Sequence, residues 1–111
     1  MGARLTYVIK FVADMDAAIA FHRDVLGIAV KFASPFWTEL ATGDTNLALH
    51  PASPENPAGS VQVGFGVDDV DAFYAAQSAA GLTFIRPPTM MHGSKIAALR
   101  DSEGAEIRVS G

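Results

Sequence analysis

The chain contains no cysteine, which excludes a disulfide framework and any thiolate chemistry. It also lacks concentrated basic charge, because only 8 lysines and arginines are scattered along 111 residues and the formal net charge is -4. Nucleic-acid binding needs clustered positive charge, so we expect no nucleic-acid partner. No apolar run approaches the roughly 20 residues of a membrane span. The sequence opens without a basic-then-apolar leader, which favours a cytoplasmic protein with no membrane partner.

Apolar residues, in contrast, are abundant at 50% of a chain whose length suits one domain. A domain of this size buries roughly two thirds of the surface that its unfolded chain exposes, which suffices for a core. The high apolar content predicts that some surface is covered by a ligand or by a second subunit. We therefore expect a homodimer.

A short pattern occurs twice, half a chain apart. Residues 12–17 are VADMDA, and residues 67–72 are VDDVDA. Each copy follows a strand-like apolar run and opens a helix-like stretch, which closes at Gly27 in the first copy and at Gly81 in the second. A duplicated unit too small to bury its own apolar face must stack on its twin. A ligand cleft tends to lie at such a seam.

The first half of the chain begins with a strand, a helix and a second strand. β-Branched and aromatic residues indicate strands over 5–12 and 28–33. Asp14 is expected to cap a helix over 15–26, which Gly27 ends. The side chains that recur at helical spacing, and which we expect to be buried, are Met15, Ala18, Ile19, His22, Val25 and Leu26.

Residues 36–42 and 45–50 predict a β-hairpin around residues 43–44, because a type II′ turn requires glycine first. This turn pairs Glu39 with Ala48, and strand alternation then separates two faces. One face carries Trp37, Glu39, Ala41, Asn46, Ala48 and His50. The more apolar face, which suits packing on helices, carries Thr38, Leu40, Leu47 and Leu49.

The second half repeats the element order after a proline-rich linker. We expect a single domain over 1–111, with module one at about 1–52, the linker at about 53–59 and module two at about 60–111. Module two predicts a strand over 61–67 and a helix that Asp69 caps and that buries Val70, Phe73, Tyr74 and Gln77. The remaining elements are a strand over 82–86 ended by Pro87-Pro88, a loop over 89–93 and a hairpin over 95–100 and 105–109.

Three segments resemble the vicinal oxygen chelate superfamily, which includes glyoxalase I, bleomycin-resistance proteins and extradiol dioxygenases. Residues 21–27 (FHRDVLG) are similar to its helix end, and residues 67–70 (VDDV) to the start of its second module. Residues 101–105 (DSEGA) resemble its closing Asp-Pro-x-Gly-Asn turn, with Ser102 where proline is usual. The resemblance implies an α+β fold of two tandem βαβββ modules that form curved mixed sheets around a cleft.

In metal-dependent members of that superfamily, four inward-facing side chains, usually histidine and glutamate, hold a divalent ion. The resemblance places the four positions, in chain order, at Tyr7, Ala48, Gln62 and Arg108. Ala48 has no donor atom, and Arg108 is a permanent cation that repels a metal. Tyr7 and Gln62 are weak oxygen ligands at best. We therefore expect no metal and no other cofactor.

The cleft that remains suits a small organic molecule with apolar and polar parts. We expect it to be lined by Tyr7, Trp37, Glu39, Ala48, His50, Gln62 and Arg108. Trp37 and Tyr7 offer rings for stacking, and Arg108 offers a planar fork for a carboxylate or phosphate. Structural alternatives stay open: Glu39 and Arg108 as a buried ion pair, Trp37 as core, His50 as a rim residue, and a hydrogen bond between Tyr7 and Gln62.

Three functions follow, and the sequence does not choose between binding and catalysis. The first is metal-independent binding of a small organic ligand, as in bleomycin-resistance-like proteins. The second is a metal-independent enzyme in which Glu39 or His50 is the catalytic base and Arg108 steadies an oxyanion. The third is a metal-dependent glyoxalase-type lyase or dioxygenase with ligands relocated to Glu39, His50 and His92. The loop containing Met90, Met91 and His92 is expected to cover the cleft mouth or to be exposed.

Overall fold

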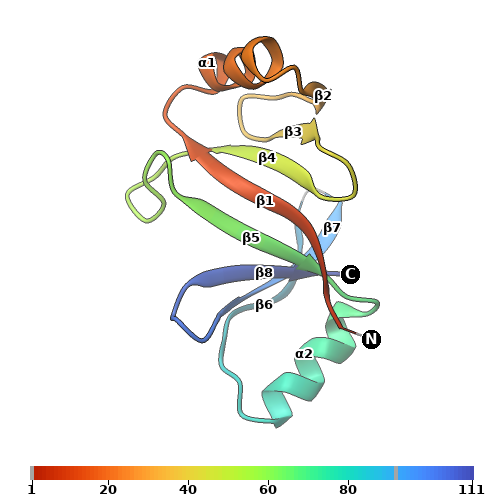
Figure 1. Ribbon diagram of the computed structural model, residues 1–111. Helices are drawn as coiled ribbons and strands as arrows, with labels where there is room; N and C mark the ends of the chain where they lie inside the picture. Colours follow the sequence, from red (N-terminus) through yellow and green to blue (C-terminus); the bar gives the residue numbers. More distant parts are fainter. Residues whose placement is uncertain (1, 92) are drawn as a thin grey trace. The chain divides into compact units, whose positions relative to one another are not determined.

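The computed structural model of the protein describes residues 2–91 and 93–111, and the chain divides into two compact units (Figure 1). The N-terminal unit comprises residues 6–62. The C-terminal unit comprises residues 63–111 together with the start of the first strand, up to Leu5. Among the described residues, no helix is both long enough and apolar enough to cross a membrane.

The N-terminal unit is built on a mixed sheet with the strand order β2-β3-β4-β1. Strand β1 runs parallel to β4, and the other neighbours are antiparallel. The elements are β1 (Arg4–Val12), α1 (Met15–Ala20), a π-helical segment η1 (Phe21–Val25), β2 (Ala29–Phe32), β3 (Thr38–Ala41) and β4 (Asn46–Pro51).

The C-terminal unit has the same topology, with the strand order β5-β8-β7-β6. Strand β5 runs parallel to β8, and the other neighbours are antiparallel. The elements are β5 (Val61–Gly66), α2 (Val70–Ala79), β6 (Phe84–Met91), β7 (Ser94–Arg100) and β8 (Glu106–Ser110). In each unit the first strand lies beside the fourth, which confirms the predicted α+β fold of two βαβββ modules.

Both helices begin at the repeated aspartates, as predicted. Asp14 Oδ1 accepts a hydrogen bond from the Ala17 backbone N–H at 3.0 Å, and Asp69 Oδ1 accepts one from the Ala72 N–H, also at 3.0 Å. The two aspartates have extended backbones, with φ of -134° and -147°, as an N-cap residue requires. The repeat in the sequence is therefore a pair of helix N-caps.

The first helix differs from the predicted continuous α-helix, because it changes to π-helical geometry at Phe21. The Leu26 backbone N–H donates to the Phe21 carbonyl at 3.3 Å, five residues back instead of four. A wider turn shifts the phase of the helix surface. Consequently Val25 and Leu26 are 66% and 55% exposed, and the prediction that they are buried is wrong.

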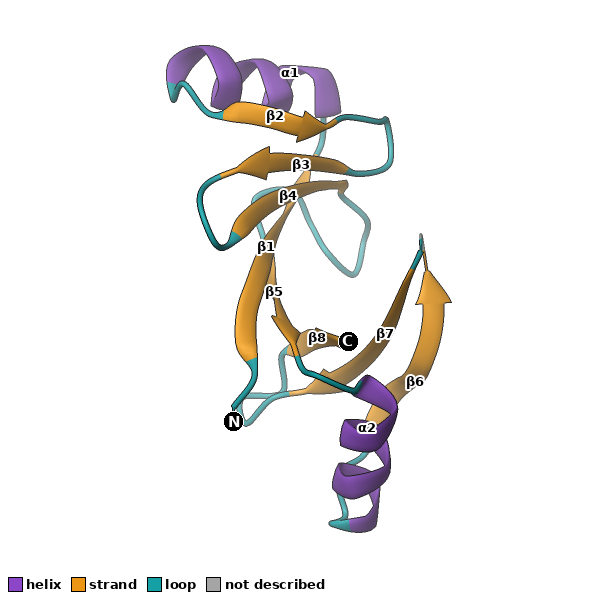
Figure 2. Cartoon of the chain, turned by 90° about the vertical axis from the view of Figure 1, so that its right-hand side faces the viewer, coloured by secondary structure: helices purple, strands orange, loops and turns teal. Residues whose placement is uncertain are grey.

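The core of the C-terminal unit lies between α2 and one face of its sheet. Figure 2 shows α2 beside β6, and the helix contacts both β6 and β7. The buried core residues are Val70, Ala97, Leu99 and Val109, with Phe65, Val67, Phe73, Phe84 and Ile107 packed against them. Strand alternation therefore leaves the intervening residues, Ala98 and Arg108 among them, on the opposite face.

Strand β6 runs further than the sequence predicted. It continues through Pro87 and Pro88 to Met91, so the predicted strand end at Arg86 and the predicted loop over 89–93 are wrong for these residues. Because β6 is an edge strand of its unit, a proline that lacks an N–H need not interrupt its ladder with β7. His92 lies outside the described residues.

Candidate functional site

The hairpin of the N-terminal unit has the predicted register. Glu39 pairs with Ala48 across β3 and β4, and Gly43 in the turn has a φ of 107°, which glycine adopts readily. On the other side of β4, the parallel strand β1 aligns Ile9 with Ala48 and Phe11 with His50. These pairings bring one set of side chains to a single sheet face, here called the aromatic face: Tyr7, Ile9, Phe11, Trp37, Glu39, Asn46, Ala48 and His50.

The opposite face of the same sheet has a buried centre. Thr38, Leu40 and Leu49 are all fully buried there, and α1 packs on β4. This arrangement agrees with the prediction that these side chains face the helix. The aromatic face carries the carboxylate of Glu39, the amide of Asn46 and the imidazole of His50.

Four rings of the aromatic face contact one another edge to face. Trp37 lies between Tyr7 and His50, with ring centroids 5.9 and 6.2 Å apart and interplanar angles of 82° and 83°. Phe11 contacts His50 from the other side, at 5.4 Å. Edge-to-face contacts orient the rings as well as packing them. The face therefore presents aromatic surfaces in fixed directions.

Glu39 is held among these rings by two donors. The Trp37 indole N–H donates to Oε2 at 3.0 Å, and the Asn46 amide donates to Oε1 at 3.4 Å. An ionised carboxylate has about four lone-pair positions, so acceptor capacity remains after both bonds. Asn46 was placed on this face from the hairpin register, but its contact with Glu39 was not predicted.

His50 has a defined orientation at the end of β4. Its Nδ1 lies 2.8 Å from the Pro51 carbonyl oxygen, which can only accept, so Nδ1 carries the proton. In the neutral ring, Nε2 therefore keeps its lone pair. The ring is half-buried between Phe11 and Trp37. This geometry suits either a hydrogen-bond acceptor or a proton acceptor.

Two of the predicted cleft residues are buried. Ala48 is 0% exposed and packs with Ile9 and Phe11 beneath Tyr7 and Trp37, so it forms a floor under the rings. Gln62, on β5, is 5% exposed, and its Oε1 accepts no hydrogen bond from any residue that the structure describes. The last predicted cleft residue, Arg108, belongs to β8 of the C-terminal unit.

The donor set of the aromatic face does not fit a divalent metal. Ala48 offers no ligand atom, and the residues of this face that commonly bind divalent metals are Glu39 and His50. Over residues 2–91 and 93–111, no group of three histidine, cysteine, aspartate or glutamate side chains could hold a metal ion. Three ligands are the usual minimum of a catalytic zinc site.

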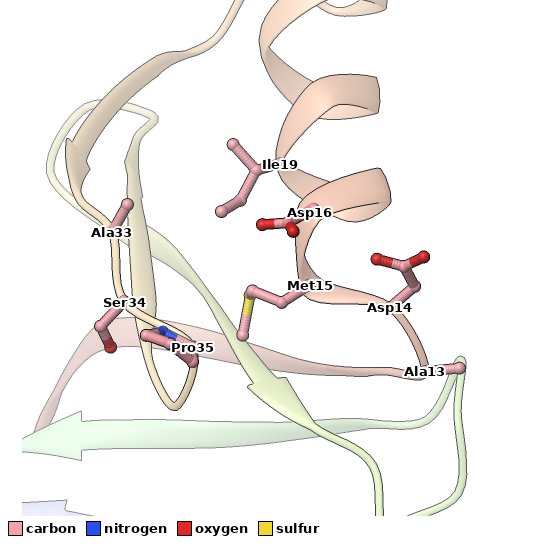
Figure 3. A pocket seen from close by; sticks show the side chains of 8 residues that line it. All are labelled: Ala13, Asp14, Met15, Asp16, Ile19, Ala33, Ser34 and Pro35. Carbon is pink, nitrogen blue, oxygen red and sulfur yellow. The ribbon is translucent and has the colours of Figure 1, made fainter.

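A separate surface hollow of about 560 Å³ lies in the N-terminal unit, where α1 begins (Figure 3). It is lined by Ala13, Asp14, Met15, Asp16, Ile19, Ala33, Ser34 and Pro35. Two of its polar side chains serve the local fold, since Asp14 caps α1 and Ser34 Oγ bonds to the backbone of Trp37. The Ser34 hydroxyl accepts from the Trp37 N–H at 3.0 Å and donates to the Trp37 carbonyl at 2.9 Å. Ser34 therefore positions Trp37.

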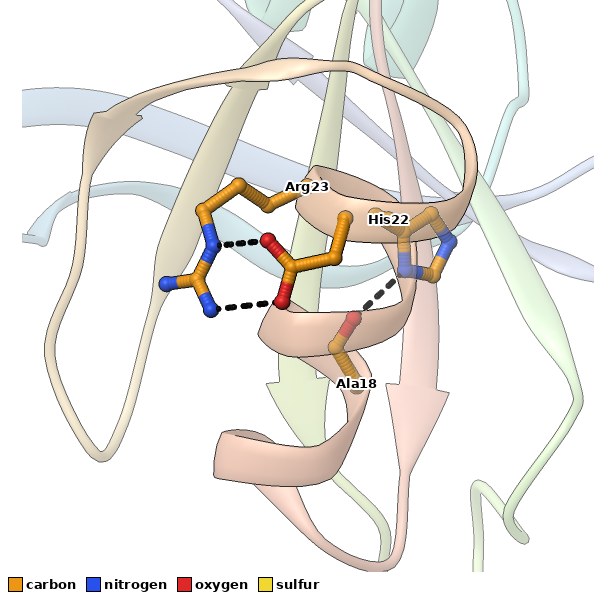
Figure 4. Close-up of polar contacts among 4 residues, drawn as sticks. Ala18, His22 and Arg23 are labelled. Atoms are coloured by element: carbon orange, nitrogen blue, oxygen red, sulfur yellow. Dashed lines mark hydrogen bonds and ion pairs between the residues drawn. The ribbon is translucent and has the colours of Figure 1, made fainter.

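The charged and histidine contacts of η1 are structural (Figure 4). Arg23 donates two hydrogen bonds to the Asp24 carboxylate, at 2.7 and 2.9 Å, and both side chains are exposed. The bond from Arg23 lowers the pKa of Asp24, and the same bond raises the pKa of Arg23. His22 is buried, and its Nδ1 donates to the Ala18 carbonyl at 2.7 Å. His22 is thus a packing residue, as predicted.

Comparisons with known proteins extend over nearly the whole chain. The family model described as Glyoxalase/Bleomycin resistance protein/Dioxygenase superfamily matches residues 4–109. No curated protein gives a significant match.

Three solved structures illustrate the likeness in fold. A hypothetical protein from Bacillus halodurans C-125 has a TM-score of 0.82 at 15% identity, covering 99% of this chain and 94% of that one. A methylmalonyl-CoA epimerase in complex with methylmalonyl-CoA has a TM-score of 0.80 at 22% identity, covering 97% and 93%. The methylmalonyl-CoA epimerase from Mycobacterium tuberculosis has a TM-score of 0.81 at 20% identity, covering 96% and 86%. At these identities the likeness is one of fold.

Proposed function

Because the chain belongs to the glyoxalase/bleomycin resistance protein/dioxygenase superfamily, we propose that it binds a small organic molecule on the aromatic face, without a metal ion. The observation that carries the proposal is the position of the Glu39 carboxylate among oriented rings. Trp37 and Tyr7 offer apolar surface to a flat group. Glu39 offers an acceptor to a hydroxyl, amide or amine of the same molecule.

Local support for this site makes it suited to binding. Ser34 fixes the backbone of Trp37, and Trp37 and Asn46 in turn fix the Glu39 carboxylate. A site whose side chains are already held in place loses less conformational entropy when a ligand arrives. The ligand class is therefore a flat aromatic or heteroaromatic compound that carries a hydrogen-bond donor.

The single tryptophan of the chain reports directly on this proposal. Small molecules that co-purify with the protein are identified by non-denaturing mass spectrometry and added back to stripped protein, and a library of flat aromatic amines and phenols is screened beside them. We expect saturable quenching of Trp37 fluorescence with one ligand per chain. Glu39→Gln should weaken binding, whereas Glu55→Gln, a matched change at an exposed loop residue, should not. Absence of both a co-purified ligand and saturable quenching would refute the proposal.

Proton transfer at the same face is a second candidate function, favoured by the geometry of His50. The bond to Pro51 leaves Nε2 as the basic nitrogen, and a positioned imidazole is an effective general base. The test is incubation of the bound compound in D₂O followed by mass spectrometry of that compound. Deuterium incorporation that His50→Gln abolishes, with binding retained, would establish catalysis. No incorporation with the intact protein leaves binding as the function.

A further inference from the structure

Two arginines of the C-terminal unit have buried guanidinium nitrogens without partners. Nε and Nη2 of Arg86 and Nε of Arg108 are buried and make no hydrogen bond within the described part of the chain. Neither side chain belongs to an ion pair there, since the recorded pairs involve Arg4, Arg23 and Lys95. A buried cationic donor without an acceptor is costly, and folded proteins rarely retain one without a counter-ion or ligand.

The strand register places the two arginines in one row. Arg108 on β8 pairs with Ala98 on β7, and Ala98 pairs with Arg86 on β6. On its other side, Arg108 is aligned with Gly64 of β5. The row therefore reads Gly64, Arg108, Ala98, Arg86 across four neighbouring strands. It lies on the sheet face opposite α2 and its core.

An irregularity in β6 is what brings Arg86 to this face. Phe84 pairs with Leu99 and packs in the α2 core, and plain alternation would direct Arg86, two residues later, to the same side. The register shifts between Phe84 and Arg86: from one pair to the next, the chain moves two residues along β6 but only one residue along β7. Such a β-bulge reverses the side to which the following side chains point. Arg86 thus joins Arg108 and Ala98.

The space between the arginines is suited to a small anion. One strand lies between β6 and β8, and neighbouring strands are about 4.8 Å apart. The Cα atoms of the two arginines are therefore roughly 10 Å apart. The residue between them, Ala98, is short and fully buried, and Gly64 has no side chain. Two long side chains can converge above Ala98 on a shared group. Glu106 lies on the same face, two residues before Arg108 on β8, but it is aligned with Arg100, and no ion pair joins it to Arg86 or Arg108 within the described residues.

We propose that Arg86 and Arg108 form a binding site for an oxyanion, either a carboxylate or a phosphate group of a small molecule. Each planar guanidinium can donate two parallel hydrogen bonds to such a group, which provides acceptors for the orphaned nitrogens. The site uses only residues of the C-terminal unit and does not depend on the function proposed for the aromatic face.

The test is NMR of the arginine Nε–Hε groups during titration with inorganic phosphate and, separately, with acetate, at constant ionic strength. We expect the Arg86 and Arg108 resonances to shift together and to saturate with one dissociation constant. The stronger of the two anions identifies the ligand class. Absence of a saturable shift with both anions would overturn the proposal.

Substitutions make the test specific. Arg86→Gln and Arg108→Gln should each weaken anion binding about tenfold or more, as expected for the loss of charge-assisted hydrogen bonds. Arg4→Gln removes the same charge from an exposed residue of the same unit and should leave affinity unchanged. Arg108→Lys keeps the positive charge but not the planar guanidinium group. This variant should therefore fold normally and still bind the anion more weakly. Equal affinity in all four variants would show that the anion binds elsewhere, which contradicts the proposal.

Discussion

The hydrogen bond from the Trp37 indole to Glu39 makes a sharp prediction about stability. Trp37→Phe keeps an aromatic ring beside Tyr7 and His50 but removes the N–H that Glu39 accepts at 3.0 Å. A hydrogen bond to a charged group contributes about 1.5–3 kcal/mol, and half-burial of both side chains places this one near the lower limit. The smaller ring adds about 1 kcal/mol of lost packing. Trp37→Phe should therefore lower the free energy of unfolding by about 2.5 kcal/mol in total.

A double-mutant cycle with Glu39→Gln separates the hydrogen bond from the packing. Glutamine still accepts from the indole, but a neutral hydrogen bond contributes only about 0.5–1.5 kcal/mol. Trp37→Phe should therefore cost about 1 kcal/mol less in the Glu39→Gln background, which corresponds to a smaller loss in melting temperature of about 4 °C. Urea unfolding at pH 7 with a constant m-value measures this coupling.

The control cycle combines Trp37→Phe with Glu55→Gln, at an exposed loop residue. These two changes should add to within about 0.5 kcal/mol, as expected for sites without shared contacts. If Trp37→Phe costs the same in the Glu39→Gln background as in the wild type, the indole does not bond to the carboxylate. The reasoning that makes Glu39 a fixed acceptor would then be refuted.

Four further predictions concern the fold, the metal, the pH dependence and the assembly. Asp14→Ala and Asp69→Ala should each lower the free energy of unfolding by about 1 kcal/mol in urea titrations, because each removes an equivalent N-cap. A loss of stability in only one of the two variants would contradict the equivalence of the two caps. Elemental analysis of purified protein should find no stoichiometric Ni, Zn, Fe or Mn, and one such metal per chain would contradict the metal-independent proposal. The bond from Arg23 lowers the pKa of Asp24, so this pair stabilises the fold at neutral pH and the contribution disappears as the pH falls through the lowered pKa; NMR titration should show the Asp24 pKa rising in Arg23→Gln. The sequence predicts a homodimer, and Phe21, 51% exposed on η1, is a candidate contact whose change to serine should shift sedimentation towards monomer if it lies in the interface.

Features that depend on neighbouring residues were predictable from the sequence. The helix caps at Asp14 and Asp69 need only a side-chain oxygen and an N–H three residues later. The pairing of Glu39 with Ala48 follows from a two-residue turn, because loop length determines hairpin register. The same register is why the sequence predicts one shared face for Trp37, Glu39, Asn46, Ala48 and His50.

Features that depend on distant strands were not predictable. The β1–β4 pairing places Phe11 against His50 and completes the aromatic face, but no local signal specifies a parallel register. The two prolines after Arg86 indicated a strand end, and only the edge position of β6 explains why the strand continues. The π-helical turn at η1 likewise has no signal in the residue spacing.

The sequence by itself determined the duplicated architecture and the helix caps, because these follow from residue chemistry and short-range spacing. Only the tertiary structure decided which side chains meet. It held Glu39 between Trp37 and Asn46, and it aligned Arg86 with Arg108 through a shift of register in β6. The physical reason is that a one-residue shift between strands moves a side chain to the other face of the sheet, and that shift is set by pairing over long distances in the chain.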